Sequence, residues 1–468
     1  MIQEERDRIV PFLVAKVHPP GLPDLFIRRP AIELQLKSAL REEKKVLYLS
    51  APPGYGKTST LALLAAEADR PHIWLTLDMF DNAPGNLAAY LARAVREGGF
   101  SSEVIEHFTT GSAGTSMTEE TQQAGHVFEM LSILSAEKNP FLLFLDNLHE
   151  IENKVLLKVL EEFIYYLPHG CCLAIATRED IPLPLWHLRN CGNLIELRQE
   201  ELKASEQEMQ QFLALSGVAI QQEVSKALLQ RLGGWWSCLR LFSVAWLLRP
   251  EKERSIFAER FRGTERFIAE FLLDSIYTHL SSECSQAASL LAVPDFFNED
   301  LAQTILGPDF SPQVLQILRQ HNLLIISDAG QISRYRFHPL LRDYFRYQLS
   351  PSRQRDAHLA AADWFDKRKF IQRAARHREY ALKLLSKCSQ DIKLRNTTGE
   401  TNISGVKISS RELDLLEALE AGLSNEDIGE KLFISTGTVK WHLHNIYEKL
   451  DARSRTEAIR KAHLLGIL

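Results

Sequence analysis

Short apolar runs alternate with helical patterns over the first two hundred residues. Four runs are typical of buried β-strands: KKVLYLS (44–50), HIWLTLD (72–78), FLLFLDN (141–147) and CCLAIATR (171–178). A helix is expected from Lys57 to Ala66, between the first two strands. Strands that alternate with helices form a parallel sheet covered on both faces. Residues 1–200 are therefore predicted to form an α/β domain with a parallel sheet, a layout typical of nucleotide binding.

The pattern becomes helical after residue 200. SEQEMQQFLALSG and RFIAEFLLDSIYTHL carry apolar residues at helical spacing, which predicts an all-α subdomain over 201–282. The apolar stretch NLLIIS, a turn at Asp328 to Gly330 and the segment RYRFHPLLRDYF then suggest a winged helix. The predicted order after residue 200 is a helical subdomain (201–282), a winged helix (283–350), a short helical segment (351–388), a linker (389–406) and a C-terminal helix-turn-helix (407–468).

Composition indicates which class of protein this chain belongs to and where it is expected to reside. Of its 468 residues, 45% are hydrophobic and 25% are charged, as in ordinary soluble proteins. The N-terminus lacks a signal pattern and no apolar run is long enough to span a bilayer, so we expect a cytoplasmic protein with no membrane partner. Its six cysteines show no C-x-x-C pairing, which favours reduced core thiols and no structural metal.

A glycine-rich turn, APPGYGKT (51–58), joins the first strand to the first helix. Such a turn presents backbone N–H groups and the positive end of a helix to an anion. Lys57 is expected to reach the terminal phosphates of a nucleotide, and the Thr58 hydroxyl is expected to bind Mg²⁺. The other predicted nucleotide contacts in the loop are Gly54, Tyr55, Gly56 and Ser59. Ala51 replaces the usual first glycine, so we expect a distorted loop; the alternative is an ordinary Gly/Pro turn.

Two further strand ends carry candidate chemistry. Asp146 ends an apolar strand, where a carboxylate can hold Mg²⁺ through water. Asn147 follows at a position where many ATPases have a second acid, so hydrolysis is expected to be slow, with Glu150 as the one nearby candidate base. Arg178 ends the fourth strand and is a candidate γ-phosphate sensor, or else a solvated loop arginine. Lys57, Asp146 and Arg178 are thus the candidate catalytic residues of what is at most a slow ATPase acting as a switch.

The C-terminal segment has the pattern of a DNA reader. Ser409 with Glu412, and Ser424 with Asp427, are spaced as capping boxes and mark two helix starts. On a third helix, apolar residues spaced 4, 3 and 4 apart predict one buried face: Val439, Leu443, Ile446 and Leu450. Three short helices with a tight turn match helix-turn-helix geometry.

The outward face of the third helix and its flanks supply the candidate DNA contacts. The net charge of the chain is −5, so DNA binding needs a local basic patch. Residues 435–461 provide one, because six Lys or Arg outnumber three acids there. The predicted contacts are Ser435, Thr436, Thr438, Lys440, Trp441, His444, Asn445, Lys449, Arg453 and Arg455. The alternative is a helical protein-interaction module with a solvated basic face.

These motifs together resemble a known family. The segment from ISSREL to AIRKA (408–462) is similar to the LuxR-type helix-turn-helix over its whole length. The upstream part resembles the MalT-like, ATP-dependent branch of that family, which belongs to the STAND class of signalling ATPases. The supporting segments are LVAKVHPP (13–20), RRP (28–30), APPGYGKT (51–58), WLTLDMFDN (74–82), LDNLHEI (145–151), ATREDIPLPLWHLRNCGNLIEL (176–197), FRGTERFIAEFLLDSI (261–276) and YRFHPLLRDYF (335–345).

The resemblance implies an ATP-dependent transcription regulator, and more specifically an activator. ADP is expected to favour a closed form, and ATP an open form that self-associates and binds double-stranded promoter DNA, with RNA polymerase as a further partner. It also implies that Arg178 senses the nucleotide and that His338 contacts its phosphates, whereas the residues alone would suit a packed turn histidine. The alternatives are a motor or remodelling ATPase tethered to DNA, and a degenerate regulator with constitutive DNA binding.

Two departures from the family change these expectations. Trp236 follows Trp235 where the family often has a proline that contacts the nucleotide base. Only about 50 residues (353–406) stand where the large relatives insert their inducer-binding helical repeats. We therefore expect a shortened regulator without the long sensor.

Overall fold

The computed structural model describes most of the chain in two compact units. The described residues are 14–100, 102, 104–105, 120–137, 139–220, 222–308, 310–328, 333–397, 410–432, 439, 443, 446–447, 449–450, 452, 454–464 and 468. The first unit extends to Phe261 and includes Ser311–Ser327 and Phe337–Pro339. The second unit takes in Arg262–Phe310, Asp328–Arg336 and the chain from Leu340 onwards.

A five-stranded parallel sheet forms the centre of the first unit. Its strands are β1 (Val46–Ser50), β2 (His72–Thr76), β3 (Leu142–Asp146), β4 (Cys172–Thr177) and β5 (Leu194–Leu197), in the spatial order β2-β3-β4-β1-β5. Every pairing is parallel, with Ser50 opposite Thr177 and Asp146 opposite Ala176. The carboxyl ends of β1, β3 and β4 therefore meet at one edge, where ligands bind in open α/β sheets.

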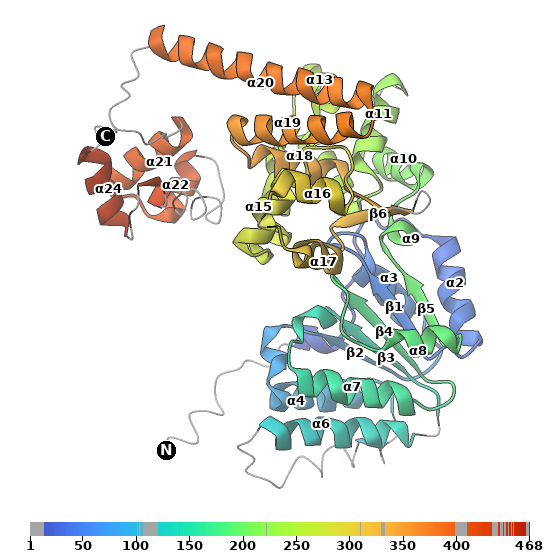
Figure 1. Cartoon of the computed structure of the whole chain (residues 1–468). Coiled ribbons are helices and arrows are strands. Elements are labelled where there is room, and N and C mark those ends of the chain that lie inside the picture. The colour runs from blue at the N-terminus through green and yellow to red at the C-terminus, as the bar shows by residue number, and fades with distance from the viewer. Residues whose placement is uncertain are drawn as a thin grey trace. The chain divides into compact units, whose positions relative to one another are not determined.

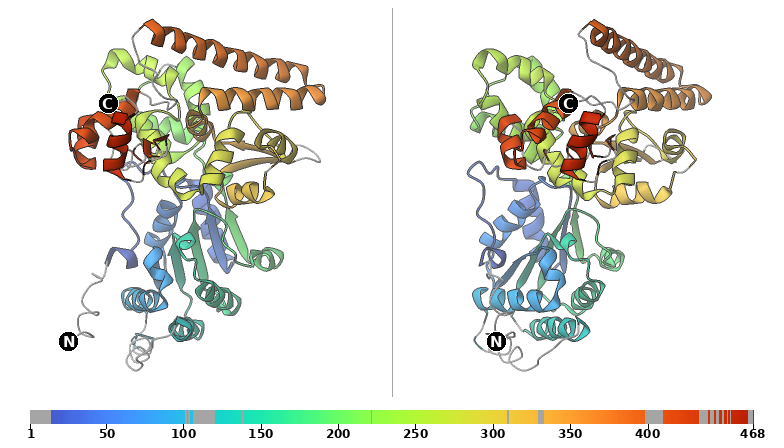
Figure 2. Two further views of the ribbon diagram at one scale, coloured as in Figure 1. Left: turned by 60° about the vertical axis from the view of Figure 1, so that its left-hand side comes forward. Right: turned by 90° about the vertical axis from the view of Figure 1, so that its left-hand side faces the viewer.

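Helices cover both faces of this sheet (Figures 1 and 2). On one face α4 (Pro84–Glu97), α6 (Glu120–Ser135) and α7 (Lys154–Tyr166) share a core with alternate strand residues such as Tyr48 and Leu143. On the other face α3 (Lys57–Ala66) packs on β3 and β4, and α2 (Pro30–Arg41) packs on α3. The remaining short elements around the sheet are η1 (Val14–Val17), η2 (Met79–Asn82), η3 (Leu148–Glu150) and α8 (Leu185–Asn190).

The four predicted strands and the predicted helix are confirmed. Each strand lies within its predicted range, and α3 begins and ends at the predicted residues. Sequence reasoning missed β5, the edge strand next to β1. Only four residues long and partly exposed along most of its length, β5 has no continuous apolar run to mark it.

Helices follow the sheet within the first unit, as the sequence predicted. They are α9 (Gln199–Leu202), α10 (Glu206–Leu215), α11 (Gln222–Leu232), α12 (Trp236–Leu247), α13 (Glu251–Arg260) and, later in the chain, α17 (Pro312–Gln320). Ser205 and Glu208 form a reciprocal capping box at the start of α10, with N–H to oxygen distances of 2.7 and 3.2 Å. Phe242 of α12 packs against Phe257 and Phe261, with ring centroids 5.4 and 4.9 Å apart, which ties α12 to α13.

Several helices precede a helical hairpin in the chain. They are α14 (Arg266–Ser275), η4 (Tyr277–His279), α15 (Ser282–Leu291), α16 (Glu299–Leu306) and α18 (Pro339–Tyr347). Strands β6 (Leu324–Asp328) and β7 (Ser333–Phe337) form a two-stranded sheet. Phe297 bridges to Tyr335 of β7 within the second unit. The hairpin consists of α19 (Pro351–Lys367) and α20 (Ile371–Thr397), which pack side by side (Figures 1 and 2). Because α20 continues to Thr397, residues 389–397 of the predicted linker are helical.

The C-terminal segment forms its own small core. Its described helices are α21 (Ser410–Glu420), α22 (Asn425–Leu432) and α24 (Arg455–Leu464). The predicted buried face is confirmed, because Val439, Leu443, Ile446 and Leu450 are all buried in this core. The capping box of α22 is confirmed as well: the Asp427 N–H donates to Ser424 Oγ at 3.2 Å, and the Ser424 N–H to Asp427 Oδ2 at 3.0 Å.

The structure also bears on the expectations about membrane-spanning helices and cysteines. None of the described helices is both long and apolar enough to cross a membrane. The five cysteines whose side chains the structure describes carry free thiols, and four of them are buried; the Cys388 side chain lies outside the described residues.

Candidate functional site

The loop between β1 and α3 is shaped to receive an anion. Gly54 and Gly56 have φ angles of 82° and 80°, a left-handed conformation that glycine adopts without steric cost. Gly56 directly precedes α3, so the first backbone N–H groups of that helix face the loop. Ala51 is fully buried and is not among the described residues with a positive φ angle. The position therefore does not require glycine, and the helix starts as predicted despite the substitution.

Lys57 lies inside this loop and is 7% exposed. Its Nζ donates to the carbonyl oxygens of Ala51 and Pro52 at 2.6 and 2.9 Å. The pKa of the Lys57 ammonium group is lowered to about 7, mainly by burial and also by the nearby Arg178, while Asp146 acts in the opposite direction. A buried cation that is held only by two carbonyl oxygens is a natural partner for an anionic ligand.

Thr58 and Asp146 lie together, as the sequence predicted. The Thr58 hydroxyl is 3.0 Å from both carboxylate oxygens of Asp146, which is 2% exposed. Burial raises the pKa of Asp146, while the hydrogen bond from Thr58 lowers it. One hydroxyl and one carboxylate at the end of β3 are oxygen ligands that suit Mg²⁺ bound together with phosphates.

The next residue, Asn147, has an amide side chain at the position where many ATPases have a second acid. Its φ angle is 60° and its ψ angle 39°, a left-handed conformation that asparagine tolerates better than most residues. Glu150, the predicted candidate base, lies in η3 and pairs with His149, whose Nε2 is 3.4 Å from Glu150 Oε1.

A pocket of about 300 Å³ opens beside the loop within the first unit. Among the described residues, its wall carries four cationic side chains and no carboxylate, an arrangement that attracts a polyanion. The cationic residues are Arg29, Lys57, Arg178 and Arg240. The pocket wall also includes apolar residues, namely Leu25, Phe26, Ile27, Phe212 and Trp236. Basic and apolar side chains in one lining suit a ligand that joins phosphates to a planar base.

The start of α12 is hydrogen-bonded to the loop between β1 and α3. The Ser237 N–H donates to the Gly54 carbonyl at 3.1 Å, and Trp235 Nε1 donates to the Pro53 carbonyl at 2.8 Å. The approach is close, since a Cβ added to Gly54 would lie 2.3 Å from Ser237 Oγ. Glycine at position 54 therefore permits both the left-handed backbone and the contact with α12.

We expect Gly54→Ala to destabilise the protein more than Gly99→Ala does. Both glycines have a φ angle near 80°, so each substitution pays a similar backbone cost of about 1–2 kcal/mol. A Cβ at Gly99 meets nothing within 4 Å, whereas at Gly54 it meets Ser237, and such overpacking costs about 1–3 kcal/mol more. Denaturant unfolding of the two variants measures the difference. Equal destabilisation would mean that α12 does not hold the loop as described.

The structure brings most of the predicted nucleotide residues to this pocket. Gly54, Gly56, Lys57, Thr58, Ser59 and Arg178 all line it, and Asp146 lies directly behind Thr58. Arg178 is fixed at the end of β4, where its carbonyl accepts a hydrogen bond from Asn322 Nδ2 at 3.0 Å. Its predicted role as a sensor is therefore compatible with its position beside Lys57.

Tyr55 and His338 do not lie on the pocket wall. The Tyr55 side chain is 1% exposed; its hydroxyl accepts a hydrogen bond from Gln199 at 2.8 Å and its ring packs on Trp235. His338 is 3% exposed, with Nε2 3.1 Å from the Leu232 carbonyl and its ring edge-on to Trp235. Both residues thus pack against Trp235, the residue that is bonded to the loop at Pro53.

Sequence reasoning missed several residues of the pocket. Arg29, within the RRP segment, donates to the carbonyls of Leu202 and Lys203 at 2.9 and 2.8 Å and lies 5.6 Å from the Trp236 ring centre. The RRP motif was recognisable, but the neighbouring sequence does not indicate that the Arg29 guanidinium group reaches α9 and the pocket. The positions of Trp236, Ser237 and Arg240 depend equally on tertiary packing.

Two of the predicted DNA contacts, Lys449 and Arg455, lie among the described residues of the C-terminal domain. Lys449 Nζ donates to both oxygens of the buried Glu412 carboxylate at 2.6 and 2.7 Å, and Arg455 donates to the carbonyls of Leu419 and Leu423 near the end of α21. Both side chains thus hold this domain together, and phosphate contact by either stays a prediction. The other predicted DNA contacts lie outside the described residues: Ser435, Thr436, Thr438, Lys440, Trp441, His444, Asn445 and Arg453.

Two family descriptions match parts of this chain. Residues 406–462 match the bacterial regulatory proteins of the luxR family. Residues 273–358 match the MalT winged helix domain. These matches cover the C-terminal domain and the segment from α14 into α19.

Curated relatives match over a longer stretch. The HTH-type transcriptional regulator MalT of Yersinia enterocolitica is 27% identical over 331 residues, which cover 68% of this chain and 35% of that protein. MalT of Serratia proteamaculans is 26% identical over 326 residues, covering 67% of this chain and 34% of that protein. The chain thus spans about a third of the length of the curated relatives it matches.

Among solved structures, the Walker-type ATPase PABY2304 of Pyrococcus abyssi covers 70% of this chain with 13% identity and a TM-score of 0.46, which is too low to establish a common fold. The resemblance inferred from the motifs is confirmed by the family matches and the curated relatives. The chain thus matches the MalT winged helix domain and the luxR family over these two segments, and it is similar to MalT regulators along two thirds of its length.

Proposed function

We propose that this protein is a transcription regulator whose bound nucleotide controls self-association and binding to double-stranded promoter DNA. The observation that carries the proposal is the pocket beside α3, which combines four cationic side chains with an apolar wall and contains no carboxylate in its lining. The same chain ends in a luxR-family domain, which supports DNA as the target. The MalT relatives support regulation of transcription as the setting, since that is how they are named.

ATP and ADP fit the residues present. The N-terminus of α3 and Lys57 would hold the phosphates, and Arg178 lies where it can respond to the terminal one. Thr58 and Asp146 would hold Mg²⁺, which neutralises phosphate charge when bound. Trp236 and Phe212 would receive the base, so an aromatic ring here would take the place of the proline found in the family.

The packing around Trp235 offers a route from the loop to the rest of the first unit. Trp235 is bonded to Pro53, and its ring meets His338 with ring centres 4.9 Å apart. Gly233 permits this packing, because a Cβ there would lie 2.3 Å from His338 Nε2. We propose that an ATP-bound loop shifts Trp235 and releases His338 towards the phosphates, whereas ADP leaves the packing as described. Two states that differ in nucleotide affinity are sufficient for a switch.

Asn147 supports a switch over a motor or remodelling enzyme. The residue after Asp146 carries an amide in a left-handed backbone conformation, and the pocket lining contains no carboxylate that could activate water. Slow hydrolysis would then serve to end the ATP-bound state rather than to drive work.

DNA binding measured with ADP and with a non-hydrolysable ATP analogue tests the proposal. The full-length protein is mixed, at fixed salt, with DNA from upstream of its own gene while its oligomeric size is followed. We expect the analogue to give larger assemblies and at least about tenfold tighter DNA binding, which corresponds to about 1.4 kcal/mol of coupling. Equal binding and equal size with both nucleotides would contradict a nucleotide switch.

A further inference from the structure

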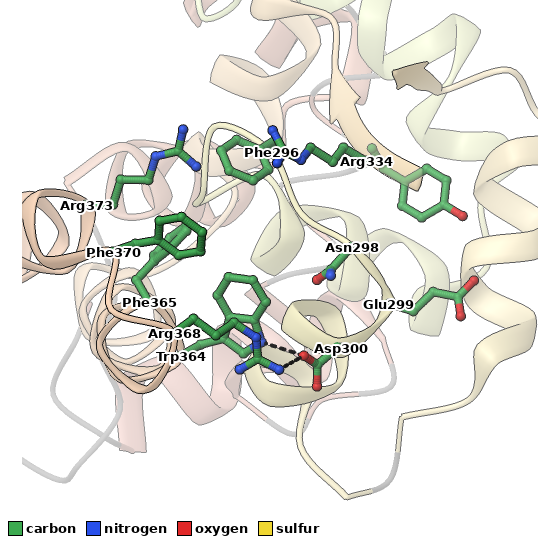
Figure 3. A pocket seen from close by; sticks show the side chains of 11 residues that line it. Phe296, Asn298, Glu299, Asp300, Arg334, Trp364, Phe365, Arg368, Phe370 and Arg373 are labelled. Carbon is green, nitrogen blue, oxygen red and sulfur yellow. Dashed lines mark hydrogen bonds and ion pairs between the residues drawn. The ribbon is translucent and has the colours of Figure 1, made fainter. Parts of the chain in front are cut away.

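A second pocket is lined entirely by residues of the second unit. It occupies about 530 Å³ between the start of α16, strand β7 and the turn from α19 into α20 (Figure 3). Its volume is in the range of small-molecule sites. Its wall is built from aromatic rings and arginines, among them Phe296, Arg334, Trp364 and Arg373.

Two of the arginines have no ion-pair partner in the part of the chain that the structure describes. Arg334 and Arg373 both lie over the Phe296 ring, with their guanidinium carbons 5.2 and 4.6 Å from its centre. They come from different elements, β7 and α20, so folding brings two cations to one aromatic ring. Contact with a ring does not neutralise a guanidinium group, and both keep their donors for an anion.

The acids near the pocket do not cancel this charge. Asp300 is already engaged, since it accepts a hydrogen bond from Trp364 Nε1 at 3.0 Å and pairs with Arg368 (Figure 3). Arg368 also lies 4.2 Å from the Trp364 ring centre. Glu299 lies on the opposite side of the pocket from Arg373 (Figure 3). The end of the pocket next to Phe296 is therefore positively charged.

The hairpin that supplies this wall is firmly packed. His358 of α19 and His377 of α20 share a hydrogen bond, with their Nδ1 atoms 2.9 Å apart, and Phe365 stacks on His377 at 5.4 Å. Burial lowers the pKa of His358 to about 3 and that of His377 to about 4, so both rings are neutral near pH 7 and one can donate to the other. The wall around Phe365 is thus held in place before any ligand arrives, which reduces the cost of binding.

We propose that this pocket binds a small organic anion that carries one carboxylate or phosphate group beside an aromatic ring. The guanidinium groups of Arg334 and Arg373 would hold the anionic group, since arginine matches the planar, two-pronged geometry of both. The aromatic walls at Phe296, Phe365 and Phe370 would enclose the ring of the ligand. The site goes beyond the nucleotide switch and does not depend on it. It would give this short chain a ligand site between the MalT winged helix match and the α19–α20 hairpin.

Titration of the full-length protein with two simple anions tests the proposal. Phenyl phosphate and phenylacetate are the probes, and benzyl alcohol is the uncharged control of similar shape. Binding is followed by calorimetry and by quenching of Trp364 fluorescence, identified by its loss in Trp364→Phe. We expect at least one anion to bind at least tenfold more tightly than benzyl alcohol, and the preferred anion shows whether the site takes phosphates or carboxylates.

Arg334→Gln/Arg373→Gln is the decisive variant. A hydrogen bond to a charged group contributes about 1.5–3 kcal/mol, so loss of both arginines should weaken anion binding at least about tenfold. Arg353→Gln removes one positive charge from an exposed part of α19 outside the pocket, and it should leave binding unchanged. Because all three arginines are exposed, unchanged unfolding midpoints are expected and serve as the folding control.

Several outcomes would overturn the proposal. They are a native protein that binds neither anion, a double variant that binds them equally well, and equal affinity for benzyl alcohol. A double variant that changes oligomeric size while anion binding persists would also overturn it, because the arginines would then serve a second copy of the chain.

Discussion

The Lys57→Ala variant is expected to lose nucleotide binding and, with it, nucleotide-dependent assembly. Lys57 is the most deeply buried cation of the phosphate pocket, and it is held there only by the carbonyls of Ala51 and Pro52. Charge-assisted hydrogen bonds to phosphate contribute about 1.5–3 kcal/mol each, so the loss should exceed about a hundredfold in affinity. Calorimetry with ATP and ADP measures the binding, and light scattering measures the assembly.

Lys44→Ala provides the matched control. Lys44 precedes β1 at the end of the strand remote from the loop and pairs with Glu42 at the surface. Its removal should leave nucleotide affinity within about twofold, because surface ion pairs contribute little. Normal ATP-dependent assembly by Lys57→Ala would overturn the proposed nucleotide switch.

The strands that carry this site were predictable because fully buried strands have continuous apolar sequences. β1, β3 and β4 are buried at every position, so each appears as an unbroken apolar run. β5 lies at the edge and is only partly buried, and its four residues carry no comparable run. α20 was cut short in the prediction because residues 389–397 lack an apolar pattern, yet they continue a helix whose first half is fixed by α19.

The candidate site was predictable where its chemistry is local in sequence. Gly54, Lys57 and Thr58 form one continuous loop, and Asp146 follows an obvious strand. The other half of the pocket comes from segments far apart in the chain, such as Arg29 and Trp236. Their meeting depends on how α12 and α9 pack, and no local pattern contains that information.

The motif did not determine the direction of the Tyr55 side chain. Tyr55 lies inside the loop motif, so the sequence placed it with the nucleotide contacts, but its side chain turns into the protein against Trp235. A motif identifies which backbone segment faces a ligand more reliably than it identifies the direction of each side chain. The same limit applies to His338, whose expected phosphate contact now depends on a rearrangement that only a bound nucleotide can test.

The second large effect is expected from Leu443→Ala in the DNA-binding domain. Leu443 is 5% exposed and packs in a core of about a dozen small and medium apolar side chains. A buried Leu→Ala change costs about 2–5 kcal/mol, which is comparable with the whole stability of a domain of this size. We therefore expect the C-terminal domain to unfold and DNA binding to be lost, while nucleotide binding at Lys57 persists. Limited proteolysis, DNA-binding assays and nucleotide calorimetry on the same protein separate these outcomes.

Lys440→Ala is the matched change on the other face of the same segment. Its neighbour Val439 is buried, so at helical spacing Lys440 is expected to face away from the core and its loss should leave the domain folded. Specific DNA binding should weaken by about 1–3 kcal/mol if Lys440 reads a base, or fall equally on all sequences if it binds phosphate. If Leu443→Ala bound DNA normally, the assigned buried face would be wrong. If Lys440→Ala changed neither kind of binding, the segment after Val439 would not be the DNA reader.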